Sequence, residues 1–337
     1  MRVLYHLTMP PSPLAACDAV VQEVEALRAH IGGELIYVNP TRRPGSLYPE
    51  RLYGLHRLPD LRRREATADL HHLYHSHLYP FPYLRWLRKP VVYTVAGGVG
   101  TTAPRGLDRL TTLARIVVNN TRDFETLRGW GLRNAQMIQP GIDIARFTPQ
   151  PPPATTGLAL LAGSAPWTVK QFESKGVNAL LAVAQVRSDV RLIFLWRGLH
   201  FEELQRRVAQ HGLGERVTII NQRVNVSEVL AQVHAALVLA QDATLVKAYP
   251  HSLLEALMAG RPVLVSRAIP MADYVEQTGC GVIVENVDAQ SILRALDELT
   301  AHYPQLREAA LHVDRETFSL DRLAYHQLYR DVAHGPR

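Results

Sequence analysis

Glu255 lies one turn into a segment whose sequence predicts a ligand-binding helix. We expect Ser252 to cap a helix from about Ser252 to Ala259, because a serine hydroxyl can accept a hydrogen bond from the first amides of a helix. The unpaired amides at positions 252–254 would attract a phosphate, and Glu255 could accept hydrogen bonds from a pair of ribose hydroxyls. The alternative is a surface helix whose glutamate only complements the helix dipole.

Three cations could pair with such a phosphate. Lys175 precedes Gly176 at the expected start of another helix, where an ammonium could stabilise charge that develops on a leaving group; a solvated lysine is the alternative. Lys247, eight residues before Glu255, can only donate hydrogen bonds. It would pair with a diphosphate or a ligand carboxylate, or point away from a site that has lost its role. Arg197, at the expected end of a strand, could contact a phosphate or a base, or stack on Trp196.

The elements that would position these groups alternate along the chain. Short apolar strands and amphipathic helices follow one another in two series, which predicts two α/β domains with mainly parallel sheets. Residues 149–153 read Pro-Gln-Pro-Pro-Pro, which is typical of a stiff linker. We therefore expect Rossmann-like domains at residues 1–148 and 157–319, joined by a linker at 149–156. The segment from about 320 to 335 reads as one more amphipathic helix.

Composition fits a globular protein of two domains. The chain has 337 residues, of which 47% are hydrophobic and 20% are charged. Its net charge of +6 comes from the first half of the chain. Residues 1–150 contain 19 basic and 12 acidic residues, whereas the rest contains 18 basic and 19 acidic residues. A basic half could meet an anionic acceptor, touch an anionic membrane peripherally, or be only a solvated face. The aromatic and basic segment 81–89 could be the interfacial helix of such a membrane contact, or a helix docked on the sheet with an arginine rim.

Other classes of protein fit less well. No nucleic-acid motif accompanies the basic charge, and no apolar run has the length of a transmembrane helix. Two distant cysteines, Cys17 and Cys280, favour a cytoplasmic location. A dinucleotide oxidoreductase would carry a glycine-rich loop after its first strand, whereas residues 8–13 are free of glycine and rich in proline.

Several segments, in matching order, resemble the family-4 glycosyltransferases of the GT-B fold. The donor-site signature of that family is a glutamate, seven residues and a second glutamate, often preceded by Pro-Asn-Ser-Leu-Leu. Pro250, Ser252, Leu253, Leu254 and Glu255 match it, with His251 at the asparagine position. Residues 1–5 are similar to the family's opening strand, 139–149 to the end of its first domain, and Lys175-Gly176 to the start of a helix in its second domain. The resemblance covers most of the chain.

The resemblance implies a fold and a function. Two Rossmann-like domains would face each other across a cleft, with residues 320–335 packing back on the first, acceptor-side domain. A sugar would pass from a nucleoside-diphosphate sugar, such as a UDP- or GDP-sugar, to a carbohydrate, lipid or small-molecule acceptor, with retention and without a cofactor or metal. Lys175 and Lys247 are the catalytic candidates. The donor-binding candidates are Glu255, His251, Ser252, Leu253, Arg197, Ser164, Gly97 and Gly98.

The chain departs from the family pattern in a longer segment at 165–174, in the absence of a glycine pair after the first strand, and at several single positions. Lys247 stands in place of the first glutamate, Ala96 where a histidine is common, and Ser164 where an arginine is usual. These departures favour a second hypothesis from a different class: a catalytically silent GT-B protein that binds a sugar nucleotide or a partner as a sensor or scaffold.

Four histidines between residues 71 and 77 suggest a metal site. His75 and His77 would share one face of a predicted strand and could supply two ligands. No nearby carboxylate or cysteine completes the set, and the resembled family often has such a pair without a metal. We therefore expect structural or acceptor-side histidines and no bound metal.

Overall fold

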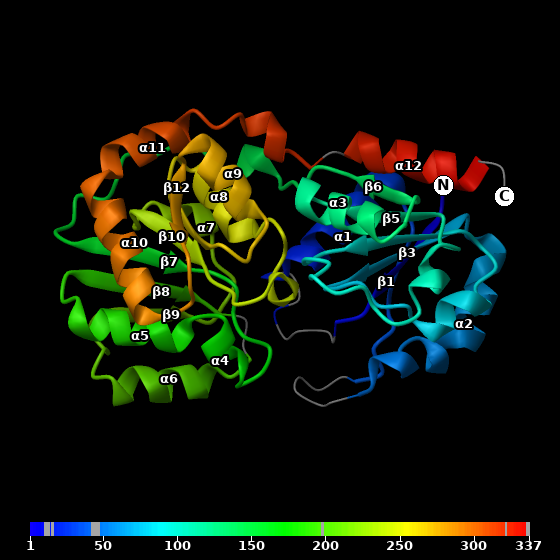
Figure 1. Cartoon of the computed structure of the whole chain (residues 1–337), viewed down its shortest axis with the longest axis horizontal. Helices are drawn as coiled ribbons and strands as arrows, with labels where there is room; N and C mark the ends of the chain where they lie inside the picture. Colours follow the sequence, from blue (N-terminus) through cyan, green and yellow to red (C-terminus); the bar gives the residue numbers. More distant parts are fainter. Residues whose placement is uncertain (10–13, 15–16, 42–47, 197–198, 321, 335–337) are drawn as a thin grey trace. The chain divides into compact units, whose positions relative to one another are not determined.

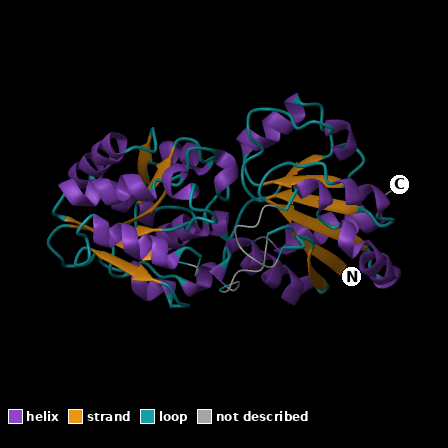
Figure 2. Cartoon of the chain, turned by 90° about the horizontal axis from the view of Figure 1, so that it is seen from below, coloured by secondary structure: helices purple, strands orange, loops and turns teal. Residues whose placement is uncertain are grey.

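The computed structural model describes residues 1–9, 14, 17–41, 48–196, 199–320 and 322–334, and the chain divides into two compact units (Figure 1). The first unit holds Asp18–Pro140 with the described residues of Met1–Pro11 and Leu320–Arg337. The second unit holds Gly141–Ser319 with the described residues of Ser12–Cys17. Within each unit, helices flank a sheet (Figure 2). In this part of the chain, no helix has the length and apolarity needed to cross a bilayer.

The first unit is built on a six-stranded sheet in which every neighbouring pair is parallel. In spatial order its strands are β2 (Glu34–Tyr37), β1 (Val3–Leu7), β3 (Leu70–His75), β4 (Val91–Val95), β5 (Arg115–Val118) and β6 (Ala135–Met137). Strands β1, β3 and β4 are buried along their whole length, as the apolar runs of a doubly covered parallel sheet require. Their carboxyl ends therefore meet at one edge.

Two helices distant in the sequence cover one face of this sheet. Helix α1 (Ala19–Ile31) begins at Asp18, whose carboxylate accepts hydrogen bonds from the amides of Val20 and Val21, at 2.9 and 3.4 Å. Helix α12 (Arg322–His334), drawn in red in Figure 1, buries Tyr325 and Tyr329 in the same hydrophobic cluster as β1 and β3. The last helix of the chain thus belongs to the first unit.

Helices α2 (Leu58–Arg64) and α3 (Thr121–Gly129) cover the other face, together with a 3₁₀ segment, η5 (Pro82–Trp86). The sequence left two interpretations of segment 81–89 open: an interfacial helix, or a helix docked on the sheet with an arginine rim. In the structure the segment packs on the sheet, with Phe81, Tyr83 and Leu84 buried in the core and the Arg85 guanidinium over the Trp86 ring at 4.2 Å. The aromatic side chains of this segment serve packing, because the sheet beneath offers them an apolar surface.

The second unit also has a six-stranded sheet with only parallel pairs. In spatial order its strands are β12 (Gly281–Val284), β11 (Val263–Ser266), β10 (Ala235–Val238), β7 (Leu158–Ala162), β8 (Val190–Leu195) and β9 (Val217–Ile220). The predicted fold class, α/β with two Rossmann-like units of parallel strands, is confirmed.

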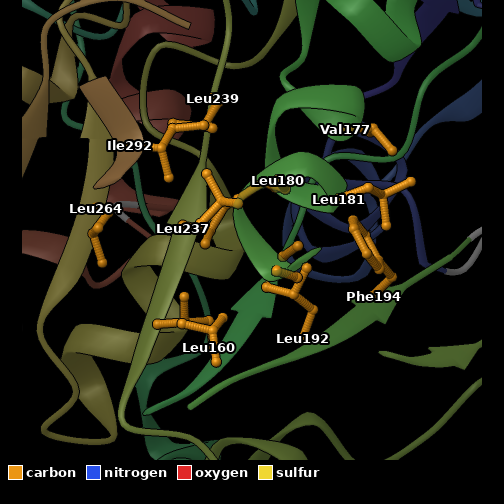
Figure 3. Close-up of a cluster of buried hydrophobic side chains, with 14 of the residues drawn as sticks. Leu160, Val177, Leu180, Leu181, Leu192, Phe194, Leu237, Leu239, Leu264 and Ile292 are labelled. Atoms are coloured by element: carbon orange, nitrogen blue, oxygen red, sulfur yellow. The ribbon is translucent and has the colours of Figure 1, made fainter. Parts of the chain in front are cut away.

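Helices cover both faces of the second sheet because side chains alternate along its strands. One face buries leucines of β7, β8 and β10 against α5 (Val177–Val186) and α10 (Ala289–Ala301), as Figure 3 shows. Helices α4 (Gln171–Ser174) and α6 (Phe201–Gln210) add to this cluster. The opposite cluster holds α7 (Val226–Leu230), α8 (His251–Met258) and α9 (Met271–Thr278), and α11 (Tyr303–Leu311) contributes to both.

The division between the units differs from the expected boundary at residue 148. The Ile142 amide donates to the Phe318 carbonyl at 2.8 Å, and Phe147 is buried in a core cluster of the second unit. The buried Arg261 guanidinium donates to the carbonyls of Gln150 and Pro151 at 3.1 and 2.7 Å. Residues 141–148 and part of the expected linker are therefore fixed to the second unit.

Candidate functional site

Helix α8 begins one residue earlier than the sequence suggested. Its N-cap is Pro250, whose carbonyl accepts hydrogen bonds from the amides of Leu253 and Leu254 at 3.0 and 3.2 Å. Ser252 is therefore not the N-cap, and two of the three amides expected to be unpaired have a partner within the helix. The Leu253 side chain is fully buried in the core, so its predicted part in ligand binding is limited to its backbone.

The Ser252 side chain lies instead against the loop that follows β7. A Cβ atom at Gly163 would come within 2.3 Å of Ser252 Oγ and 2.8 Å of Ser252 Cβ. The Gly163 amide donates to the Leu237 carbonyl at 3.1 Å, which ties the loop to β10. The absence of a side chain at Gly163 thus allows the loop to contact the first turn of α8.

The same loop holds Lys175. Its ammonium donates to Ser164 Oγ at 3.1 Å and to the Ala165 carbonyl at 3.4 Å, and only 5% of the residue is exposed. Ser164 has φ 66°, a left-handed conformation that costs a non-glycine residue about 1 kcal/mol or more. The lysine follows α4, and the next residue, Gly176, is the N-cap of α5. A buried cation therefore lies at the carboxyl end of β7.

Glu255 is buried one turn into α8, with 8% of the residue exposed. Burial raises the pKa of its carboxyl group to about 7, and the charge of Arg146 opposes that rise. Among the residues that the structure describes, no donor forms a hydrogen bond with this carboxylate. The carboxylate therefore retains acceptor capacity for hydroxyl groups of a ligand.

Lys247 contacts His251 at the start of the same helix. Lys247 Nζ lies 3.2 Å from His251 Nε2. Burial lowers the pKa of His251 well below its usual value, and the charge of Lys247 lowers it further. The imidazole is therefore neutral near pH 7, and its Nε2 can accept a hydrogen bond from the ammonium. The structure thus joins two of the predicted site residues in one pair.

Two of the remaining candidates belong to the first unit. Gly97 and Gly98 follow β4 in the first unit, where the Gly97 amide donates to the Ser76 carbonyl at 2.9 Å. Arg197 lies outside the residues that the structure describes. The structure therefore gathers Ser164, Lys175, Lys247, His251, Ser252 and Glu255 after strands of the second sheet.

One cluster in the first unit contains a residue that the sequence analysis missed. Glu50 lies beside His75 and His77, whereas no carboxylate had been expected near these histidines. Burial lowers the pKa of His75 to about 4, although Glu50 raises it in part. The sequence signal for Glu50 is its position just after Pro49, in the connection between β2 and β3. Because 25 residues separate it from His75, the sequence does not indicate that the two side chains are in contact.

Each unit is an open parallel α/β sheet, a class of fold that binds ligands at the carboxyl ends of its strands, and in the second unit cations and a carboxylate follow those strands. Residues 168–310, which lie in the second unit, match the family of glycosyl transferases group 1. A comparison with curated proteins finds no match.

Solved structures support the same fold. Sucrose-phosphate synthase from Thermosynechococcus elongatus is 15% identical, with a TM-score of 0.71 over 98% of this chain and 99% of that chain. HepE from Anabaena, in complex with UDP and glucose, is 14% identical, with a TM-score of 0.68 over 99% and 98%. WaaG, a glycosyltransferase involved in lipopolysaccharide biosynthesis, is 16% identical, with a TM-score of 0.65 over 99% and 100%. The predicted GT-B fold is thereby confirmed.

Proposed function

We propose that the protein is a glycosyltransferase that moves a sugar from a nucleoside-diphosphate sugar to an acceptor hydroxyl. The match of residues 168–310 to glycosyl transferases group 1 supports this class of activity. HepE, which shares the fold, has been solved with UDP and glucose, and this favours a uridine nucleotide for the first tests. The acceptor would be a carbohydrate, a lipid or a small molecule.

The observation that carries the proposal is the buried ammonium of Lys175. In glycosyl transfer, an acceptor oxygen forms a bond to the anomeric carbon and loses its proton. The bond from that carbon to the diphosphate breaks, and the diphosphate keeps the electron pair. A cation fixed by Ser164 Oγ and the Ala165 carbonyl would stabilise this charge without having to reorganise. Because the lysine supplies the positive charge, the diphosphate needs no metal ion.

Glu255 and the pair of Lys247 and His251 complete the proposed donor site. The Glu255 carboxylate would accept hydrogen bonds from the two ribose hydroxyls. Lys247 would contact the diphosphate, or a carboxylate on the donor sugar. Retention of anomeric configuration follows from the resemblance to the family-4 enzymes.

The test is turnover and binding with matched lysine variants. Wild-type protein should hydrolyse at least one member of a panel of UDP- and GDP-sugars, and titration calorimetry should detect binding of the matching nucleoside diphosphate. Lys175→Met should weaken that binding by about 1.5–3 kcal/mol, the range for a hydrogen bond to a charged group. Lys170→Met is the control, because Lys170 is exposed five residues away.

The outcomes separate the candidate functions. Binding of nucleotide without turnover of any donor, with a range of acceptors, would favour the silent sensor or scaffold, which Lys247 and Ala96 suggested. Equal binding by Lys175→Met and Lys170→Met would contradict the assigned role of Lys175. Absence of nucleotide binding by folded wild-type protein would overturn the proposal itself.

A further inference from the structure

A carboxylate and two imidazoles converge at the carboxyl end of β3. His75 is the last residue of that strand, His77 lies two residues beyond it, and Glu50 begins a 3₁₀ turn, η2 (Glu50–Leu52). Glu50 Oε1 lies 3.5 Å from His75 Nε2, and Glu50 Oε2 lies 3.3 Å from His77 Nε2. One ligand atom from each residue lies within 4.8 Å of the others. The three groups belong to one unit, so their spacing is a property of that unit alone.

The hydrogen bonds of Thr8 determine which nitrogen of His75 carries the proton. Thr8 Oγ1 donates to the Tyr74 carbonyl at 3.1 Å, so its oxygen must accept the hydrogen bond from His75 Nδ1 at 2.6 Å. His75 Nε2 is then left with a lone pair that points toward Glu50. This nitrogen is buried, and its neighbour among the described residues is Glu50 Oε1 at 3.5 Å, which does not form a hydrogen bond of normal geometry with it. Two electron-rich groups thus face each other.

We propose that Glu50, His75 and His77 bind a divalent transition-metal ion, for which Zn²⁺ is the best match. Imidazole nitrogen and carboxylate oxygen are zinc ligands, and a set of two histidines and one glutamate leaves a fourth position for water or a substrate atom. With metal–ligand distances of about 2.0–2.2 Å, neighbouring ligand atoms of a tetrahedral site lie roughly 3.3–3.5 Å apart. Glu50 Oε1 lies at this spacing from His75 Nε2, at 3.5 Å, and Glu50 Oε2 lies at this spacing from His77 Nε2, at 3.3 Å, so each oxygen matches it toward one imidazole.

The surroundings hold both histidines in position. The Phe81 ring packs edge-on against His75, with 4.9 Å between ring centroids, and Ser76 Oγ lies 3.2 Å from His77 Nδ1. The hydrogen bond from His75 Nδ1 to Thr8 is the kind of outer contact that fixes the orientation of a metal-binding imidazole. His77 and Glu50 are each one-third exposed at the side chain, which gives an ion a route from solvent. These three residues belong to the first unit, whereas Lys175 belongs to the second.

Zinc titration of the untagged protein tests the site. Protein stripped with a chelator and then dialysed should bind one Zn²⁺ per chain with high affinity, measured by calorimetry and by competition with a chromogenic chelator. Glu50→Gln and His77→Gln should each weaken binding at least tenfold. Neither change requires repacking of the core, since both side chains are partly exposed.

His56→Gln is the matched control. His56 is an exposed histidine of the same unit, six residues from Glu50, and should be dispensable for binding. Equal losses in His56→Gln and His77→Gln would show adsorption to surface histidines and overturn the proposal. Absence of stoichiometric Zn²⁺ binding by wild-type protein would also overturn it.

Cobalt substitution provides a second readout. The Co²⁺ form of wild-type protein should show the intense visible bands of four-coordinate cobalt, and His77→Gln should lose them. Wild-type protein that gives only the weak bands of six-coordinate cobalt would contradict the ligand geometry. Neither measurement depends on glycosyl transfer. The metal-site proposal can therefore be contradicted while the proposed function stands, and the proposed function can be contradicted while the metal site stands.

Discussion

At the scale of single residues, burial gives Glu255 a proton at pH values where an exposed glutamate has lost it. Its pKa lies near 7 in the folded protein, against 4.5 for an ordinary glutamate. The folded state thus binds an additional proton between these two pH values. The stabilising contribution of this proton is complete below pH 4.5 and is lost as the pH rises through 7. At neutral pH, about half of the molecules carry the ionised carboxylate.

Nucleotide binding should therefore depend on pH through Glu255. Ribose hydroxyls that donate to the carboxylate favour its ionised form, so binding should release a proton near pH 6–7. Between pH 6 and pH 8 the ionised fraction rises from roughly one-tenth to nine-tenths, which predicts an increase in UDP affinity of about tenfold from this residue. The measurement is calorimetry in buffers that differ in ionisation enthalpy.

Glu255→Gln separates this effect from the titration of UDP itself. The variant keeps an acceptor oxygen but cannot ionise, so it should bind UDP with a shallower pH dependence and release fewer protons. Identical pH profiles for the two proteins would remove Glu255 from the nucleotide site.

Lys247 supports a second prediction at the residue scale. If its ammonium contacts the diphosphate, Lys247→Glu should weaken UDP binding by more than Lys247→Ala, because the carboxylate adds repulsion to the lost attraction. Lys170→Glu controls for the change in net charge. If Lys247 instead selects an acidic sugar, UDP affinity should hold while donors with a carboxylate are lost. Higher activity on neutral donors, with unchanged UDP affinity, would mark a site that has lost its role.

At the scale of elements, the contact between the β7 loop and α8 decides the position of the site. Gly163→Ala would place a methyl group 2.3 Å from Ser252 Oγ, so the loop or the helix must shift. We expect a loss of about 1–3 kcal/mol in the free energy of unfolding, as for other overpacked positions, and weaker UDP binding. Urea unfolding and calorimetry measure the two effects.

The added mutation Ser252→Gly identifies the cause. Removal of the serine side chain should restore part of the stability and UDP affinity lost in Gly163→Ala. The losses in the double variant should therefore be smaller than the sum of the losses in the two single variants. Gly214→Ala is the control, because a Cβ atom there would meet nothing within 4 Å. Additive effects of the two mutations would show that the clash lies elsewhere.

The elements themselves were largely predictable, whereas contacts between distant residues were not. Apolar runs and turn residues indicated the strands and the helix that holds Glu255, because burial on both faces of a parallel sheet requires such runs. The start of α8 was misplaced by one residue. Ser252 has the side chain of a good N-cap, but Pro250 already has the extended backbone that an N-cap needs. Glu50 was missed because its partners lie 25 and 27 residues later in the chain.

At the scale of the molecule, the first unit holds an unusual set of buried histidines. His6, His71, His72 and His75 are all buried at its sheet. Burial lowers the pKa of each, to about 3 for His72 and about 4 for His75. Between these values and 6.5, the unfolded chain binds protons that the folded unit does not. The unit should therefore lose stability as the pH falls below 6.5.

His72 offers the clearest measurement of this effect. It lies between Thr94, at 2.7 Å, and Tyr329 of the last helix. Each linked proton changes the free energy of unfolding by about 1.4 kcal/mol per pH unit. Urea unfolding between pH 5 and 6 gives the slope of the free energy of unfolding against pH. For His72→Gln, this slope should be smaller than for wild-type protein by about that amount.

The exposed His30 provides the control for that slope. His30→Gln is measured alongside, because it removes a histidine whose side chain is exposed in the folded unit. If His72→Gln retains the full wild-type slope, proton uptake by buried histidines does not govern the acid stability of the unit.

The position of α12 has a consequence for synthesis of the protein on the ribosome. All six strands of the first unit's sheet lie within the first 140 residues, yet Tyr325, Leu328 and Tyr329 contribute, together with α1, to the core on one face of that sheet. A nascent chain that has released only its amino-terminal half therefore exposes Val3, Tyr5 and Tyr74, which this helix would cover. The second unit, whose sheet is contiguous in the sequence, can mature while translation is still under way. The first unit is thus the first to be synthesised, but its core is completed last, once α12 has been made.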